Sequence, residues 1–82
     1  MRDSTSLATT VRETLASTFG LDIAAIPDDV TQQSCASWSS LNHMVLLVAL
    51  EEQFAVRFTL GEMASMRSLS SIVAALAAHG VA

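Results

Sequence analysis

The sequence has no lysine and no tyrosine, and it carries only one proline, one tryptophan and one cysteine among its 82 residues. Its basic residues are four arginines against eight acidic residues, which leaves a formal net charge of −4. A nucleic-acid-binding domain of this size needs a basic stripe, and an acidic membrane surface attracts clusters of basic residues. We therefore expect no nucleic-acid partner and no membrane partner, whereas a basic protein partner is compatible with the charge.

Long apolar runs and paired cysteines are also absent. No apolar run is longer than Met44 to Leu50, which is far shorter than a membrane span, and the first residues lack the apolar stretch of a signal peptide. Cys35 has no second cysteine to pair with, which fits a reducing compartment. Without another thiol or a ligand cluster, it indicates neither a redox site nor a metal site. We expect a cytoplasmic protein that holds no metal.

The composition that remains is that of a small folded domain. Hydrophobic residues make up 51% of the chain and charged residues 15%, which excludes intrinsic disorder. A chain of this length is expected to form a single domain over residues 1–82, with one core and no deep catalytic cleft. Because few charges are available to cover its surface, some apolar side chains are expected to face outward.

Apolar residues recur at helical spacing in three segments, and no segment has a convincing strand pattern. The segments are residues 7–19, with Gly20 placed to end the helix, about 41–54, and about 68–80. Thr59 and Glu62 have the spacing of a capping box, which predicts the start of a further short helix. The expected core consists of Leu7, Val11, Leu15, Leu46, Leu50, Phe54, Phe58, Ile72 and Leu76.

A long loop, Leu21 to Ser39, joins the first two predicted helices. It is longer than structureless loops usually are in compact domains, so its apolar residues are expected to pin it to the core. Those residues are Leu21, Ile23, Ile26, Val30 and Trp38. The sequence therefore predicts an all-α monomer, a small three-to-four-helix bundle with a long loop between helices 1 and 2.

The second predicted helix has two apolar faces. At about 100° per residue, one face carries His43, Leu46, Leu47, Leu50 and Phe54. The other carries Leu41, Met44, Val45 and Val48, here called the outer stripe, flanked by Glu51 and Glu52. A helix in a small bundle needs only one apolar face. The outer stripe is therefore either a partner-docking surface, with the glutamates supplying complementary charge, or a surface buried beneath the long loop.

The start of this helix is a candidate functional site. Ser39 is placed as its N-cap and Ser40 as its first residue, where unpaired backbone N–H groups and the helix dipole favour a phosphate. Ser40 is otherwise a helix-terminal serine without chemistry. A hydrolase built on Ser40 and His43, which are neighbours on a helix, lacks an evident oxyanion hole and orienting acid. We therefore expect no enzymatic activity.

Two stretches, Ser39-Ser40-Leu41 and Leu50-Glu51-Glu52-Gln53-Phe54, stand in a register that resembles the acyl carrier proteins. The second helix of that family opens with Asp-Ser-Leu and closes with Leu-Glu-Glu-x-Phe. Trp38 and His43 are similar in position to the Trp and the His of a Trp-Asp-Ser-Leu-x-His sequence, which occurs in a subset of free-standing bacterial carriers. Residues 56–58 and 66–73 stand where such carriers place their third and fourth helices. The resemblance covers essentially the whole chain.

The resemblance implies a carrier that has no turnover of its own. A phosphopantetheinyl transferase would attach the 4′-phosphopantetheine of coenzyme A to Ser40, and the thiol of that arm would hold an acyl or aminoacyl group as a thioester. The transferase and the enzymes that load or transfer the group would dock at Ser39, Leu41, Met44, Val45, Val48, Glu51 and Glu52. The alternatives are a peptidyl or aminoacyl carrier, and an unmodified, carrier-like interaction subunit.

The chain departs from the family pattern at three positions. Ser39 stands in place of the aspartate that precedes the modified serine, so a carboxylate that helps the transferase recognise the site is missing. Asn42 and Val45 stand where fatty-acid carriers have acidic residues. The outer face is therefore more apolar than in a general fatty-acid carrier, which favours a dedicated carrier in a specialised biosynthetic pathway.

Overall fold

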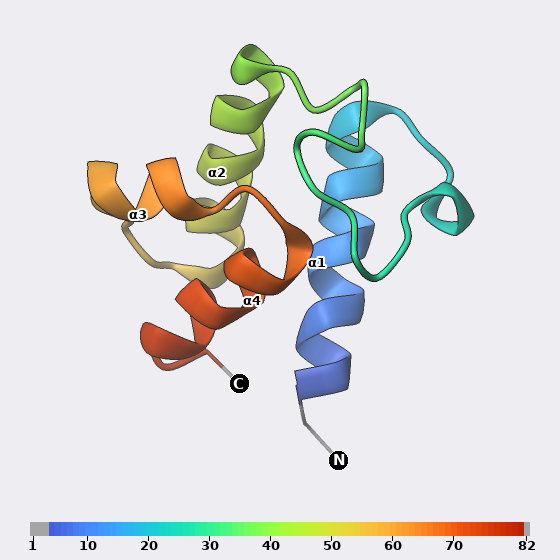
Figure 1. Cartoon of the computed structure of the whole chain (residues 1–82). Helices are drawn as coiled ribbons and strands as arrows, with labels where there is room; N and C mark the ends of the chain where they lie inside the picture. The colour runs from blue at the N-terminus through green and yellow to red at the C-terminus, as the bar shows by residue number, and fades with distance from the viewer. Residues whose placement is uncertain (1–3, 82) are drawn as a thin grey trace.

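Four α-helices and one short 3-10 turn make up the part of the chain that the computed structural model describes, residues 4–81, with side chains from Leu7 onward. The elements are α1 (Ser4–Phe19), η1 (Ile23–Ala25), α2 (Ser40–Phe54), α3 (Leu60–Ser65) and α4 (Leu69–Ala78). Both α2 and α4 pack against α1 (Figure 1). No strand occurs in this range, so the prediction of a small all-α bundle with a long first loop is confirmed.

Short polar side chains set the helix starts. The Oγ of Ser39 accepts a hydrogen bond from the N–H of Asn42 at 3.1 Å, which makes it the N-cap of α2. Thr59 and Glu62 form the predicted capping box at α3, each side chain accepting from the backbone N–H of the other. Ser68 caps α4 in the same manner. Each cap satisfies donors that a helix leaves unpaired at its first turn.

The core contains the residues predicted for it, with one exception. Its fully buried members include Val11, Leu15, Leu46 and Leu50, each with 0% of its surface exposed. Phe54 is the exception, because it is the last residue of α2 and is only half-buried against the cluster. The core also takes residues that were not in the predicted set: Ala16, Leu47, Met66 and Leu69, and from the loop Ile26, Val30 and Trp38.

The long loop is held to the bundle by its side chains and by its backbone. Its residues Ile26, Val30 and Trp38 are buried as predicted, whereas Leu21 and Ile23 are only half-buried. The guanidinium of Arg12 donates to the carbonyl of Ile26 from Nη2 at 2.8 Å and from Nε at 3.1 Å. An arginine on α1 therefore satisfies loop carbonyls that the apolar contacts alone would leave unpaired.

A second set of backbone bonds ties the loop to the turn between α3 and α4. The N–H of Gln32 donates to the carbonyl of Arg67 at 2.8 Å, and the N–H of Leu69 donates to the carbonyl of Val30 at 3.1 Å. These bonds surround an isolated antiparallel bridge between Thr31 and Ser68. The loop and the start of α4 are thereby fixed side by side, close to the first turn of α2.

Candidate functional site

Ser40 opens α2 and faces solvent. Its neighbours fix the backbone around it, because Ser39 caps the helix and the Nδ2 of Asn42 donates to the carbonyl of Ser37 at 2.7 Å. The hydroxyl of Ser40 forms no hydrogen bond with any residue that the structure describes. The hydroxyl is therefore exposed and unpartnered at the start of a capped helix.

His43, one turn further along α2, is fully occupied by structural hydrogen bonds. The Nε1–H of Trp38 donates to its Nδ1 at 3.0 Å, and its Nε2 lies 2.9 Å from the carbonyl oxygen of Met63. Because Nδ1 accepts, we assign the ring proton to Nε2, which donates to that carbonyl. His43 thus joins the loop, α2 and α3. With both nitrogens engaged it has no lone pair for the Ser40 hydroxyl, so the geometry does not support a Ser40–His43 hydrolase.

A polar groove of about 620 Å³ adjoins Ser40. The long loop forms one wall, and the end of α3, the α3–α4 turn and the start of α4 form the other. Its lining residues are Thr31, Gln32, Gln33, Ser40, Ser65, Arg67, Ser68 and Ser71. We call it the Ser40 groove. Apart from Ser40, none of these residues was predicted from the sequence to be functional. They are distant in the sequence, and the backbone bonds between the loop and the α3–α4 turn bring them together.

The outer stripe of α2 is exposed. Leu41 shows 73% of its surface to solvent, Met44 47%, and Val45 and Val48 49% each. The interpretation that the loop buries this stripe is therefore wrong, because the loop packs through Ile26, Val30 and Trp38 elsewhere on the core. A further apolar side chain, Leu60 at the start of α3, is 84% exposed and was not among the predicted docking residues. Its only signal in the sequence is its place directly after the cap Thr59.

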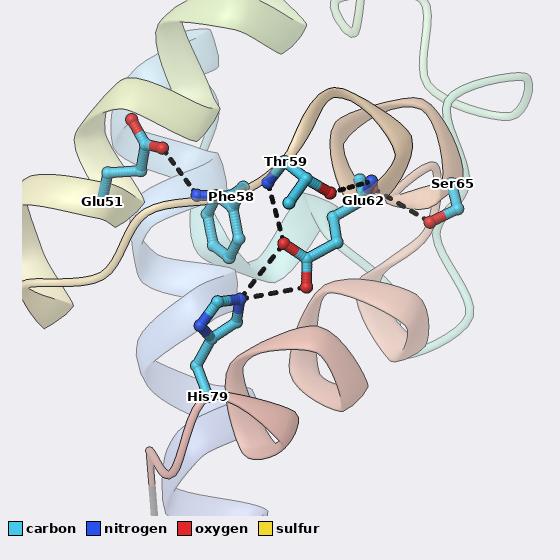
Figure 2. A network of polar contacts seen from close by, with 6 residues as sticks. All are labelled: Glu51, Phe58, Thr59, Glu62, Ser65 and His79. Atoms are coloured by element: carbon cyan, nitrogen blue, oxygen red, sulfur yellow. Dashed lines mark hydrogen bonds and ion pairs between the residues drawn. The ribbon is translucent and has the colours of Figure 1, made fainter.

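The two glutamates predicted to dock partners have different surroundings. An Oε2 atom of Glu51 accepts from the N–H of Phe58 at 2.9 Å, so this half-buried carboxylate holds the connection between α2 and α3 (Figure 2). Glu52 is exposed and forms no such bond. Of the pair, Glu52 is the one whose charge is wholly available to a partner.

A second polar cluster joins the start of α3 to the end of α4 (Figure 2). The carboxylate of Glu62 accepts from the N–H of Thr59 at 2.8 Å and lies 3.0 Å and 3.2 Å from the Nε2 of His79. The His79 ring meets Phe58 edge-on, with centroids 5.5 Å apart. The bond from Thr59, and secondarily the contact with His79, lower the pKa of Glu62 below its ordinary value. The contacts among Thr59, Glu62 and His79 therefore have a structural role, and these three residues lie outside the Ser40 groove.

The lowered pKa of Glu62 predicts a loss of stability in acid. Its ionised form stabilises the folded state fully above the unfolded pKa of about 4.5, and this contribution is lost as the pH falls through the folded pKa. Glu62→Gln keeps an oxygen that can accept from Thr59 but removes the charge. We therefore expect its melting temperature to decline less steeply than that of wild type below about pH 5. Glu13→Gln, an exposed glutamate on α1, is the control, and an equal change in slope there would contradict the assignment.

Other kinds of site find little support in the part of the chain that is described. Between residues 4 and 81, no three His, Cys, Asp or Glu side chains are grouped so that they could bind a metal ion. None of the helices in the same range combines the length and the apolar character that crossing a membrane requires. Cys35 is a free, half-buried thiol.

The chain matches no protein-family model and no curated protein. The fold and the site define a small helical bundle with an unpartnered serine hydroxyl at the start of one helix and an exposed apolar stripe along that same helix.

Proposed function

We propose that the protein is an acyl carrier that holds an acyl or aminoacyl group on a 4′-phosphopantetheine arm attached to Ser40. The observation that carries this proposal is the free Ser40 hydroxyl at the first residue of a capped helix whose exposed apolar stripe begins at the next residue. The resemblance of residues 38–54 to carrier proteins supplies the identity of the arm. As part of the proposal, the carrier acts in the cytoplasm, and the unpaired Cys35 supports this because it fits a reducing compartment.

The residues at the site fit such a group. Backbone N–H groups in the first turn of α2 favour a phosphate on Ser40, and Arg67 adds one positive charge in the adjoining groove. In the attachment, the Ser40 Oγ would displace the adenosine-bearing phosphate from the phosphopantetheine phosphorus and lose its proton to a base of the transferase. The attached arm supplies a thiol that carries the cargo as a thioester and delivers it at high effective concentration to each docked enzyme.

The outer stripe is the proposed docking surface for those enzymes. Its apolar residues offer area to bury, methionine adapts to differing contacts, and Glu52 supplies charge complementarity to a basic partner. Neither Asn42 nor Val45 provides the acidic contact of a fatty-acid carrier. We therefore favour a dedicated carrier of a specialised biosynthetic pathway, serving few partners.

Val48→Glu is expected to separate docking from folding. Because Val48 is half-exposed, the melting temperature of the variant should be close to that of wild type. In the complex with the transferase the new carboxylate would be buried and unpaired, which should weaken binding of the transferase. A loss of 1.4 kcal/mol or more at an interface contact corresponds to about a tenfold fall in kcat/KM of the modifying transferase. Ala74→Glu, an exposed site on α4, introduces the same charge and should not slow the transferase. Unfolding of Val48→Glu would show that the stripe belongs to the core.

Ser39 combines two tasks that substitutions can separate. Ser39→Ala is expected to cost about 1 kcal/mol of stability through the lost cap. Ser39→Asp should keep the cap, add roughly 0.3–1 kcal/mol through its charge at the helix N-terminus, and accelerate modification. Denaturant unfolding and transferase rates on the three proteins measure both effects. If Ser39→Asp is modified no faster than wild type, the missing carboxylate does not limit recognition.

The experiment that tests the proposed function is incubation of the wild-type chain with coenzyme A and a broad-specificity phosphopantetheinyl transferase. We expect the intact mass to rise by one phosphopantetheinyl group. A known carrier in the same tube, modified to completion, is the control for transferase activity. An unchanged mass beside that control would favour the unmodified interaction subunit.

A further inference from the structure

We infer that the Ser40 groove is the resting site of the phosphopantetheine arm, with Arg67 binding its phosphate, and that the groove selects a short, polar cargo. The cargo class is an aminoacyl or hydroxyacyl group rather than a long alkyl chain. This inference rests on the proposed function, since it requires an arm on Ser40.

The groove begins at the attachment point, and two of the segments that line it are joined by backbone hydrogen bonds. Ser40 lines it at the start of α2. The bonds from Gln32 to the carbonyl of Arg67 and from Leu69 to the carbonyl of Val30 hold its two walls at a set separation. Main-chain bonds therefore join the two segments that supply most of the lining of the groove.

The lining matches the chemistry of the arm. The arm is a chain of amides with a hydroxyl group, and it needs hydrogen-bond donors and acceptors along its length. The side-chain amides of Gln32 and Gln33 have no partner among the described residues, and both line the groove. Neutral donors and acceptors, rather than apolar side chains, make up the rest of the lining.

Among the residues that the structure describes, Arg67 is the only charged side chain that lines the groove. Its Nε donates to the carbonyl of Ala64 at 2.9 Å, which orients the guanidinium while leaving its terminal nitrogens free. No carboxylate in residues 7–81 forms an ion pair with it. A planar guanidinium with free donors is well suited to a phosphate oxygen pair.

An alkyl chain finds no comparable place beside Ser40. The core side chains on the inner face of α2 and in the α3–α4 turn leave no opening for an alkyl group. Leu46, Leu47 and Met66 are each 0% exposed, so an alkyl group could enter only by displacing them. The apolar hollow on the surface between α1 and α4 is lined by Ala8, Val73 and Ala77 among others and does not include Ser40. A long alkyl cargo would therefore lie on the surface, where much of it stays in water and where it would cover part of the outer stripe, or it would open the core; each raises the free energy of the loaded carrier above that of a chain enclosed in an apolar hollow.

The test compares amide NMR spectra of the isotopically labelled protein before and after modification, with complete modification verified by intact mass. We expect shifts at the side-chain amides of Gln32 and Gln33 and at the backbone of Arg67 and Ser71, as well as around Ser40. In the modified Arg67→Gln variant the shifts at Gln32, Gln33 and Ser71 should be lost. The modified Arg67→Lys variant should retain part of these shifts. Arg57→Gln, an exposed arginine outside the groove, is the matched control and should retain them.

The same spectra test the cargo class. A glycyl-loaded carrier should keep the groove shifts and leave the amides of Leu46, Leu47 and Met66 unchanged. Loading with an octanoyl group should also leave those core amides unshifted. Large shifts at these amides would overturn the cargo inference, because they would show that the core opens. Shifts confined to residues 38–43 in modified wild type would overturn the groove assignment. An unmodified mass would instead refute the proposed function itself.

Discussion

Ser40→Ala is expected to abolish phosphopantetheinylation completely. The new bond in the modified protein joins the side-chain oxygen of Ser40 to phosphorus, and alanine has no atom that can form it. The substitution should leave the fold intact, because Ser40 is exposed and its hydroxyl bonds to no described residue. Intact mass after incubation with coenzyme A and transferase measures the effect as all or none.

Matched serines distinguish a specific site from adventitious labelling. Ser65→Ala and Ser37→Ala change serines that lie close to Ser40 in the fold, at the end of α3 and in the loop before α2. Both variants should be modified as fully as wild type. If Ser40→Ala still gains the mass of the arm, another residue is the attachment site.

Leu50→Ala is expected to lower the free energy of unfolding by about 2–5 kcal/mol. Leu50 is 0% exposed on the inner face of α2, and truncation of such a side chain removes apolar contacts and leaves a cavity. A small domain has about 5–15 kcal/mol of stability in total, so this loss is a large share of it. Denaturant unfolding followed by circular dichroism measures the change.

The control for Leu50→Ala lies two residues away on the same helix. Val48→Ala removes methyl groups from a side chain that is 49% exposed, and surface substitutions of this kind usually change stability by about 0.5 kcal/mol or less. Phe54→Ala should fall between the two, since Phe54 is half-buried. A cost at Val48 as large as that at Leu50 would mean that α2 is rotated relative to the orientation described.

Local chemistry explains why the helices and the outer stripe could be predicted from the sequence. Serine and threonine are favoured at helix starts because their side-chain oxygen accepts a hydrogen bond from a backbone N–H two or three residues later. The caps at Ser39 and Thr59 could therefore be predicted from their place before the helical pattern. The division of α2 into a buried and an exposed face follows from the helical period. Leu46 and Leu50 are buried and Met44 is exposed, as that period requires.

The features that were not predicted depend on contacts between distant residues. Nothing in the residues around Arg12 indicates that it donates to the carbonyl of Ile26, or that Glu62 meets His79. Met66 is 0% exposed in a turn between helices, where no period marks a buried position. The Ser40 groove arises in the same way, because its walls come from the loop and from the α3–α4 turn.

The role of Glu51 shows how a local pattern can be incomplete. Its place beside the outer stripe indicates a docking residue, yet one of its oxygens accepts from the N–H of Phe58. That bond satisfies a backbone donor in the connection between α2 and α3. A change at Glu51 would therefore be expected to affect stability as well as the proposed docking, and Glu52 is the better position at which to test the docking charge alone.

The most direct test of the carrier proposal is the intact mass of the protein isolated from the cells that make it, followed by identification of the modified peptide. It requires no choice of transferase or cargo. We expect a species heavier than the unmodified chain by one phosphopantetheinyl group, with or without an acyl group on it, and the added mass on the peptide that contains Ser40. Finding only the unmodified chain, in cells whose other carrier proteins bear the arm, would contradict the proposal.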